Sequence, residues 1–164
     1  MNRTCPYHPE LLPPDIPVAG LISIVHRLHA VYLNNELRHL GLTAGQLPII
    51  FSIAHRPGIT QDEIADRIHI DKGTVARAAK KLEDGGFVSR APDPRDRRRY
   101  LLTLTEKGET VVPTVLRIDQ DWENLVSSGL SDTERARLYE DLSRLAGNSI
   151  EEIRVYREVE DVIE

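Results

Sequence analysis

Cysteine is almost absent from this 164-residue sequence, and long apolar runs are missing as well. The single Cys5 excludes an internal disulfide and a zinc site built from several cysteines, so a reducing cytoplasm fits the chain best. Apolar stretches such as Ala19–Val25 fall far short of the ~20 residues that a membrane-spanning helix needs. The N-terminus has no basic stretch followed by an apolar run, which a secretory signal would have. We therefore expect neither export nor a membrane partner.

The common sequence motifs of enzyme active sites are missing too. The chain has no glycine-rich phosphate loop, no His-Glu-x-x-His zinc pattern and no Gly-x-Ser-x-Gly nucleophile elbow. Helix ends, turns or close packing account for its glycines. Because active-site residues can be scattered along a sequence, this absence disfavours an enzyme only moderately.

Charge is distributed unevenly along the chain. A formal net charge of −5 is unusual for a protein that binds nucleic acid. Between residues 66 and 100, however, ten basic side chains stand against six acidic ones, whereas the stretch after Thr105 has seven basic and fifteen acidic residues. A basic middle beside an acidic tail is expected when one surface meets phosphate, although a charged stretch is more often a solvated face. Charge alone therefore favours DNA binding only weakly.

Prolines separate the beginning of the chain from its first helix. Five of the ten prolines lie within residues 1–17, which removes backbone donors and predicts an extended arm. From residue 18 to about residue 40, apolar residues recur at helical spacing and predict a helix that Gly41 ends.

Capping signals predict where the other helices begin. Three capping boxes lie at residues 43–46, 60–63 and 131–134. The first opens a helix to about Ala54, and the second opens a short helix with Ile64, Ala65 and Ile68 inward. The third opens a long last helix. After a turn at His69-Ile70, Asp71 caps a helix to about Asp84. Thr105 opens a long helix in which Pro113 predicts a kink.

A β-hairpin with a basic tip is predicted after the helix that Asp71 caps. Phe87–Arg90 and Tyr100–Leu104 have the pattern of two short strands around a polar tip from Pro92 to Arg99. Two short helices joined by a tight turn and followed by such a hairpin are typical of a winged helix-turn-helix, a fold that is mainly α with a small β-hairpin wing. This fold places its second short helix in the major groove of DNA and its wing on an adjacent groove or the backbone.

Candidate DNA-binding residues lie on the helix after Asp71 and on the wing. Arg77 can fork onto guanine, while Lys72 and Thr74 suit phosphates or base edges. A solvated helix face explains these positions about equally well, but the adjoining arginine-rich tip favours DNA. The full candidate set is Lys72, Gly73, Thr74, Arg77, Lys80, Arg95, Asp96, Arg97, Arg98 and Arg99.

These motifs resemble the MarR family (multiple antibiotic resistance regulators) over residues 42–108. The wing segment Asp93-Pro94-Arg95-Asp96-Arg97-Arg98, with Leu102, Leu104, Thr105 and Gly108 after it, is similar to the family's wing signature. The preceding segments 71–75, 82–83 and 86–88 resemble its recognition-helix and strand-entry pattern. The flanking helices match in length, order and periodicity, so the resemblance is sharp over less than half of the chain.

The resemblance implies a homodimeric transcriptional regulator, of the repressor type, on a pseudo-palindromic operator. The implied organisation is an arm (1–17), a dimerisation helix (18–40), a winged helix-turn-helix DNA-binding domain (41–104) and C-terminal dimerisation helices (105–164). The sequence supports a partner copy, because the apolar stripe of the last helix, Leu138, Leu142, Leu145, Ile153, Tyr156, Val159 and Ile163, has little chain left to cover it. By the same resemblance, Arg98 enters the minor groove with Asp96 holding it, and Arg97 meets phosphate.

Small aromatic or anionic effectors that lower DNA affinity are a further implication of the family. His26, Arg27 and His29 could line the effector crevice, although histidines on such a helix are more often surface residues. A regulatory metal at the histidines is disfavoured without a cysteine cluster, so we expect neither metal nor cofactor. Cys5 departs from the placement of a redox-sensing cysteine in relatives, and an incidental cysteine is the favoured interpretation.

A winged-helix module that binds another protein is the remaining alternative. Such a module would keep core residues such as Ile64, Val75 and Leu82. It would have no need of Arg97-Arg98-Arg99 or of exposed bases on the helix after Asp71. Those basic residues favour DNA as the partner.

Overall fold

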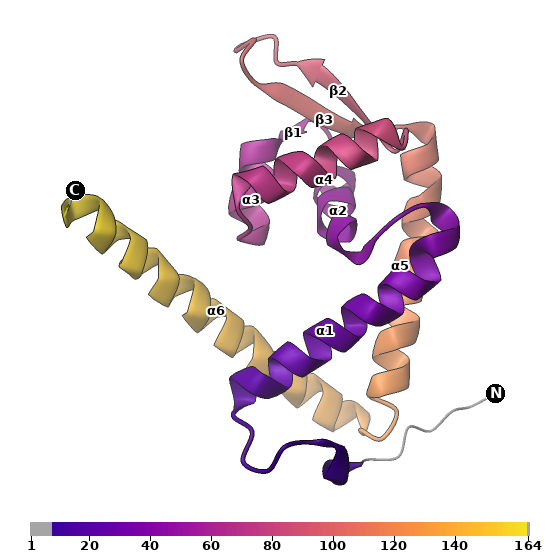
Figure 1. The fold of residues 1–164 in the computed structure, drawn as a ribbon, viewed down its shortest axis with the longest axis vertical. Coiled ribbons are helices and arrows are strands. Elements are labelled where there is room, and N and C mark those ends of the chain that lie inside the picture. Colours follow the sequence, from indigo (N-terminus) through magenta and orange to yellow (C-terminus); the bar gives the residue numbers. More distant parts are fainter. Residues whose placement is uncertain (1–7, 164) are drawn as a thin grey trace. The chain divides into compact units, whose positions relative to one another are not determined.

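The chain is mainly helical, with one small antiparallel sheet. The computed structural model describes residues 8–163, and the side chains of residue 8 and residues 10–155. The helices are α1 (Val18–Leu37), α2 (Leu47–His55), α3 (Gln61–Ile68), α4 (Lys72–Asp84), α5 (Glu106–Val126) and α6 (Asp132–Ile163), and the strands are β1 (Ile59–Thr60), β2 (Val88–Pro92) and β3 (Tyr100–Leu104) (Figure 1). Short 3-10 turns η1 (Pro9–Leu11), η2 (Arg38–Leu40) and η3 (Ala44–Gln46) complete the order. The expected α fold with a β-hairpin wing is confirmed.

Two compact units make up the chain. Residues 10–123 form the larger unit, and residues 124–164 belong to the smaller one. The core of the larger unit takes residues from each of its long elements: Leu37, Ile50, Ile64, Leu82 and Val115 are all fully shielded from solvent. Because α2, α3, α4 and the sheet share this core, the helix-turn-helix and the base of the wing form one packed body.

The sheet has the strand order β1-β3-β2, with both pairs antiparallel. Leu102 of β3 lies opposite Ile59 on one side and opposite Arg90 on the other. Strand β1 was missed from the sequence because two residues are too few to show an alternating pattern. Strand β2 begins one residue later than predicted and continues to Pro92, which an edge strand tolerates.

The predicted helix starts are confirmed by their hydrogen bonds. The Thr43 and Ser131 N–H groups donate to the Gln46 and Glu134 side chains, each at 2.8 Å. Asp71 Oδ1 accepts from the Thr74 N–H at 2.8 Å at the start of α4. In the third box the Thr60 N–H donates to Glu63 Oε2 at 2.9 Å. Each box therefore occupies donors that a helix start leaves without an intrahelical partner.

Some predictions differ from the structure or fall outside it. Part of the arm forms the short turn η1 rather than an extended chain, and the segment with Cys5 lies outside the described residues. Helix α5 is assigned without a break through Pro113, and its kink stays a prediction. Ile68 is only half-buried. The backbone of α6 is helical to Ile163, but the side chains of Tyr156, Val159 and Ile163 are outside the description. Within the described residues, no helix combines the length and apolar character needed to span a membrane.

Replacing Gly108 should destabilise the larger unit. Gly108 is buried, and a Cβ there would overlap the Phe87 carbonyl oxygen and lie 3.2 Å from Leu104 Cβ. The Phe87 carbonyl cannot move freely, because it accepts a hydrogen bond from the Thr105 N–H at 3.0 Å. We expect Gly108→Ala to lower the free energy of unfolding by about 1–3 kcal/mol in urea denaturation. Gly45→Ala is the control, because no neighbouring atom lies within 4 Å of a Cβ there; equal stability of the two variants would contradict the packing.

Acid should destabilise the protein partly through Glu63. Hydrogen bonds from Thr60 hold the pKa of Glu63 below its ordinary value of 4.5, and Arg56 and Arg99 add to the effect. Because the pKa of Glu63 is lower in the folded chain, the stability that its carboxylate contributes is complete above the ordinary pKa. This contribution is lost as the pH falls through the pKa of the folded chain. Between about pH 5 and about pH 3, the melting temperature of Glu63→Gln should therefore fall less than that of the unaltered protein at the same concentration. An equal fall of the melting temperature in both proteins would show that Glu63 does not contribute to the loss of stability in acid.

Candidate nucleic-acid interface

The two short helices α3 and α4 are joined by a tight turn at His69. His69 adopts a left-handed conformation with φ 54° and ψ 41°, which is uncommon for a residue with a side chain. The Ile70 N–H donates to the Ala65 carbonyl at 3.1 Å and closes the end of α3. Asp71 then caps α4. The predicted helix-turn-helix is thus built by a left-handed residue, His69, with the capping aspartate two positions later.

Helix α4 has one buried and one exposed face. Val75, Ala79 and Leu82 are buried in the core. The predicted DNA-binding residues Lys72, Gly73, Arg77 and Lys80 are exposed, and Thr74 is half-buried. All five α4 candidates are therefore at least partly accessible to solvent on one helix.

The first turns of α4 hold their polar groups in internal contacts. Arg77 Nη2 donates to Thr74 Oγ1 at 2.8 Å, so the guanidinium lies back toward the helix start. The guanidinium fits beside Gly73 because glycine has no side chain, whereas a Cβ at this position would lie 3.3 Å from Arg77 Nη1. Hydrogen bonds from Thr74 hold the pKa of Asp71 below its usual value. The Arg77 guanidinium is therefore held along the start of α4 by Thr74.

Two lysines of α4 are paired with carboxylates. Lys72 Nζ lies 3.0 Å from Asp62 Oδ1, and Lys80 Nζ lies 2.9 Å from Asp84 Oδ1. A hydrogen bond and the charge of each partner raise the pKa of both lysines. Both lysines therefore keep their positive charge at neutral pH. Exposed ion pairs of this kind are weak, so a phosphate can replace the carboxylate.

A groove of about 650 Å³ runs beside α4. Its lining comes from η3 and from the exposed flank of α4: Thr43, Gly45, Gln46, Thr74, Ala76, Arg77, Ala78, Lys80 and Lys81. Thr43, Gly45 and Lys81 were not among the predicted site residues. The capping box at Thr43 was visible in the sequence, but no sequence signal indicated that η3 lies against α4.

Aspartates shape the tip of the wing. Asp93 Oδ1 accepts from the Arg95 N–H at 2.8 Å, and Asp96 Oδ1 accepts from the Arg98 N–H at 3.0 Å. Both are local turn bonds of the kind that aspartate favours. Asp96 thus binds the backbone of Arg98. Residues 94–99 are all exposed, so the predicted arginines share the solvent side of the tip.

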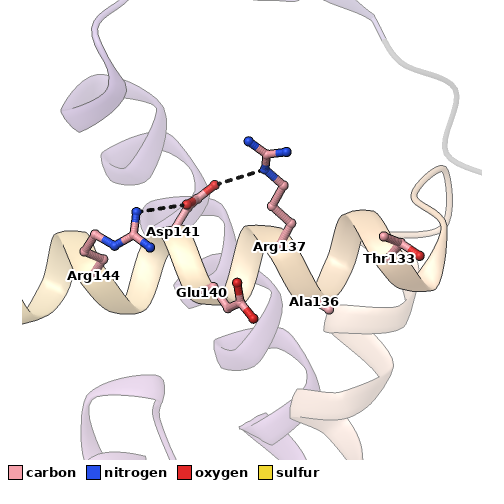
Figure 2. A pocket seen from close by; sticks show the side chains of 6 residues that line it. All are labelled: Thr133, Ala136, Arg137, Glu140, Asp141 and Arg144. Atoms are coloured by element: carbon pink, nitrogen blue, oxygen red, sulfur yellow. Dashed lines mark ion pairs between the residues drawn. The ribbon is translucent and has the colours of Figure 1, made fainter.

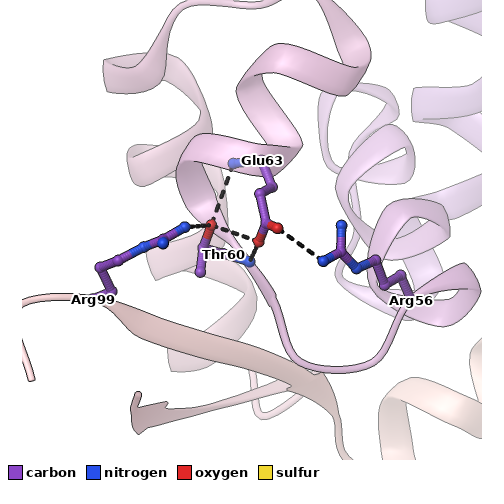
Figure 3. Close-up of polar contacts among 4 residues, drawn as sticks. All are labelled: Arg56, Thr60, Glu63 and Arg99. Atoms are coloured by element: carbon purple, nitrogen blue, oxygen red, sulfur yellow. Dashed lines mark hydrogen bonds and ion pairs between the residues drawn. The ribbon is translucent and has the colours of Figure 1, made fainter. Parts of the chain in front are cut away.

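Arg99 differs from its neighbours in the wing, because its side chain reaches the start of α3. Arg99 Nη2 donates to Thr60 Oγ1 at 3.2 Å, and Figure 3 shows Thr60 between Arg99 and Glu63. On the other side of Glu63, Arg56 Nη2 lies 2.9 Å from Glu63 Oε1. At the strands, Arg90 stacks on the Tyr100 ring with 3.8 Å between its Cζ and the ring centroid.

The predicted effector residues have different surroundings. His29 stacks on Trp122 of α5 with 5.3 Å between ring centroids, and its Nε2 lies 2.9 Å from Asp119 Oδ1. Tyr32 also contacts Trp122, and burial, with two acidic groups nearby, raises its pKa. His26 and Arg27 are exposed. The structure thus gives His29 a packing role, and a ligand role for the three residues stays a prediction. Within residues 8–163, no three His, Cys, Asp or Glu side chains are grouped to hold a metal ion.

A second pocket lies on the surface of α6 and has a different character. Its volume is about 440 Å³, and it is lined by Thr133, Ala136, Arg137, Glu140, Asp141 and Arg144 (Figure 2). Asp141 Oδ2 lies 3.8 Å from Arg137 Nε, and Asp141 Oδ1 lies 3.7 Å from Arg144 Nη1. These pairs one turn apart support a solvated helix surface rather than a binding site.

Sequence comparison relates the chain to known regulators. The MarR family model matches residues 42–100. The HTH-type transcriptional regulator BilQ of Clostridium symbiosum is 32% identical over 115 residues, which are 70% of this chain and 80% of BilQ. The HTH-type transcriptional regulator YybA of Bacillus subtilis is 36% identical over 127 residues, 77% of this chain and 85% of YybA.

Structure comparison gives the same relationship. A crystal structure of MarR has a TM-score of 0.79 and 41% identity, and the match covers 85% of this chain and 95% of that one. A mutant MarR from Escherichia coli complexed with operator DNA has a TM-score of 0.72 and 29% identity, with coverage of 84% and 96%. The chain therefore belongs to the MarR family and is a transcriptional regulator, not an enzyme.

Proposed function

We propose that this regulator binds duplex DNA sequence-specifically, as a homodimer on a pseudo-palindromic operator, and represses transcription. The observation that carries the proposal is the joining of an exposed polar helix face and an arginine-rich wing tip to one core. Similar proteins have been crystallised on DNA: the mutant Escherichia coli MarR with operator DNA, and a MarR family regulator from Listeria monocytogenes with a 26mer DNA. The latter is 26% identical to this chain with a TM-score of 0.76.

Helix α4 is the proposed reader of the major groove. Arg77 supplies a fork that matches the two acceptors of guanine, and Lys72, Thr74 and Lys80 are accessible on the same helix for phosphates or base edges. Gly73 leaves the helix surface bare for close approach. Reading requires that Arg77 leaves Thr74, which is a change of one side chain and not of the fold.

The wing tip is the proposed contact outside the major groove. Arg98 enters the minor groove, whose negative potential attracts arginine, while Arg95 and Arg97 neutralise phosphates. Asp96 supports Arg98 by fixing the turn that carries it. The family resemblance implied that Asp96 holds Arg98, and we propose that it does so through the Arg98 backbone.

A homodimer is proposed because two helices expose apolar side chains. On α1 the exposed set is Val18, Leu21, Ile22, Val25, Leu28 and Val31, and on α6 it is Leu138, Leu142, Leu145, Ile150, Ile153 and Val155. Apolar stripes of this length are typical of surfaces that a second chain covers. A two-fold dimer would also place two α4 helices on successive turns of DNA.

Release from DNA by a small aromatic or anionic effector belongs to the same proposal. His26 and Arg27 remain exposed on α1 and are available to such a compound, whereas His29 would have to leave Trp122 and Asp119 to take part. Binding to chromosomal DNA agrees with the cytoplasm that the lone cysteine favours.

Selection from random duplex DNA at physiological salt tests the proposed function. We expect a pseudo-palindrome whose half-sites lie about one helical turn, ~34 Å, apart. Arg77→Ala should relax the preference at one position of each half-site and weaken binding by ~1–3 kcal/mol in titrations of the selected site. Arg137→Ala on α6 is the control, because it removes the same charge from a helix outside the proposed DNA interface. Failure to enrich any sequence, with binding to a protein partner instead, would reject DNA as the partner.

Sedimentation tests the dimer. At micromolar concentration the mass should be near twice 18.5 kDa, because covering the apolar faces of α1 and α6 stabilises the folded chain. The melting temperature should rise with protein concentration for the same reason. A folded monomer with a concentration-independent melting temperature would refute the dimer.

A further inference from the structure

Arg99 connects the tip of the wing to the helix-turn-helix through both its backbone and its side chain. Its N–H donates to the Asp96 carbonyl and its own carbonyl accepts from the Asp93 N–H, each at 2.9 Å, so its backbone closes the tip loop. Its guanidinium donates to Thr60 Oγ1 at 3.2 Å, across 39 positions of sequence (Figure 3). One residue therefore contacts both the loop that carries Arg98 and the start of α3.

Thr60 is a fixed point for that contact. It is 5% exposed, lies opposite Leu101 in the sheet, and caps α3. Its hydroxyl donates to Glu63 Oε2 at 2.8 Å and accepts from the Glu63 N–H at 3.3 Å, which leaves one lone pair for Arg99. The Arg99 guanidinium thus binds a hydroxyl whose own direction is already set by the capping box.

Charge strengthens the same arrangement. The Glu63 carboxylate stands between Arg56, at 2.9 Å, and the more distant Arg99, and both arginines contribute to lowering its pKa. A guanidinium held near a carboxylate and on a buried hydroxyl is better fixed than one held by a single neutral contact. Arg98 differs in that Asp96 binds its backbone N–H.

We propose that Arg99 is a positioning residue, which fixes the direction of the wing tip relative to α3 and α4 so that Arg98 is delivered to the DNA. The inference rests on the proposed DNA binding, but it replaces the direct DNA contact expected of Arg99 with a contact inside the protein. Its partner is Thr60, and Glu63 and Arg56 hold that partner in place. The wing tip and the reading helix then approach DNA as one preordered surface.

The first test needs no DNA. Nuclear magnetic resonance order parameters of the backbone amides at residues 93, 95 and 98 report the mobility of the tip on the picosecond to nanosecond scale. We expect Arg99→Ala and Thr60→Val to lower these order parameters, whereas Arg98→Ala and Thr60→Ser leave them unchanged. Thr60→Ser is the matched control because it keeps the hydroxyl. An equally rigid tip in Arg99→Ala would overturn the positioning role, and this readout stands even if Thr60→Val does not fold.

The second test measures affinity for the selected operator as a function of salt. Arg97→Ala should make the plot of log affinity against log salt shallower by about one unit, as expected for a lost phosphate contact. Arg98→Ala should weaken binding strongly, because it removes the proposed minor-groove contact. Arg99→Ala should weaken binding about tenfold or more with a slope that changes by less than about half a unit. Thr60→Val should add no further loss to Arg99→Ala, because contacting residues that act together are non-additive.

The outcomes separate this inference from the proposed function. Full operator affinity in Arg98→Ala would reject the wing as a DNA contact, while the order parameters would still decide what Arg99 does. A slope shallower by about one unit in Arg99→Ala, with a rigid tip and an additive Thr60→Val, would make Arg99 an ordinary phosphate contact. That result would overturn the inference and leave the proposed function intact.

Discussion

The burial of β3 between two strands and over the core is the constraint on which the interface depends. Leu102, 1% exposed, faces Ile59 of β1 and Arg90 of β2, and its carbonyl accepts from the Gly58 N–H at 2.8 Å. Gly58 has φ 82°, so the turn before α3 meets the strand through a conformation that glycine adopts readily. The strand that leads out of the wing is thereby bound to the chain that leads into the helix-turn-helix. Movement of the wing base without movement of α3 would break this ladder.

Sequence alone predicted the parts of this arrangement that are encoded locally. Capping boxes need residues three apart, so the starts at Thr43, Thr60 and Ser131 were visible and are confirmed. The cap at Asp71 and the strand Tyr100–Leu104 followed in the same way from nearby residues. The family resemblance added the assignment of the wing, because its aspartates and arginines form one continuous segment. The fold class needed no information beyond these short-range patterns.

Contacts between distant residues could not be predicted. The two residues of β1 have no alternation of their own and become a strand only because β3 lies beside them. Arg99 stood in a run of three arginines, and nothing in that run distinguished the side chain that turns to Thr60 from those that face solvent. His29 likewise appeared equivalent to His26, although it stacks on a tryptophan 93 positions later. In each case the missing information was which elements pack together.

In the free protein three side chains of α4 already have partners inside the chain, so DNA binding as proposed would exchange these contacts for contacts with DNA. Lys72 holds Asp62, Lys80 holds Asp84, and Arg77 holds Thr74 before any DNA arrives. In the proposed complex, each contact of these three side chains with a phosphate or base replaces an internal one, so the affinity that they contribute is a difference between two sets of contacts. Non-specific DNA offers phosphates but no matching base edges, so it compensates for only part of what is given up. Asp62 and Asp84 would in this way lower the affinity of the regulator for any DNA sequence without touching DNA themselves.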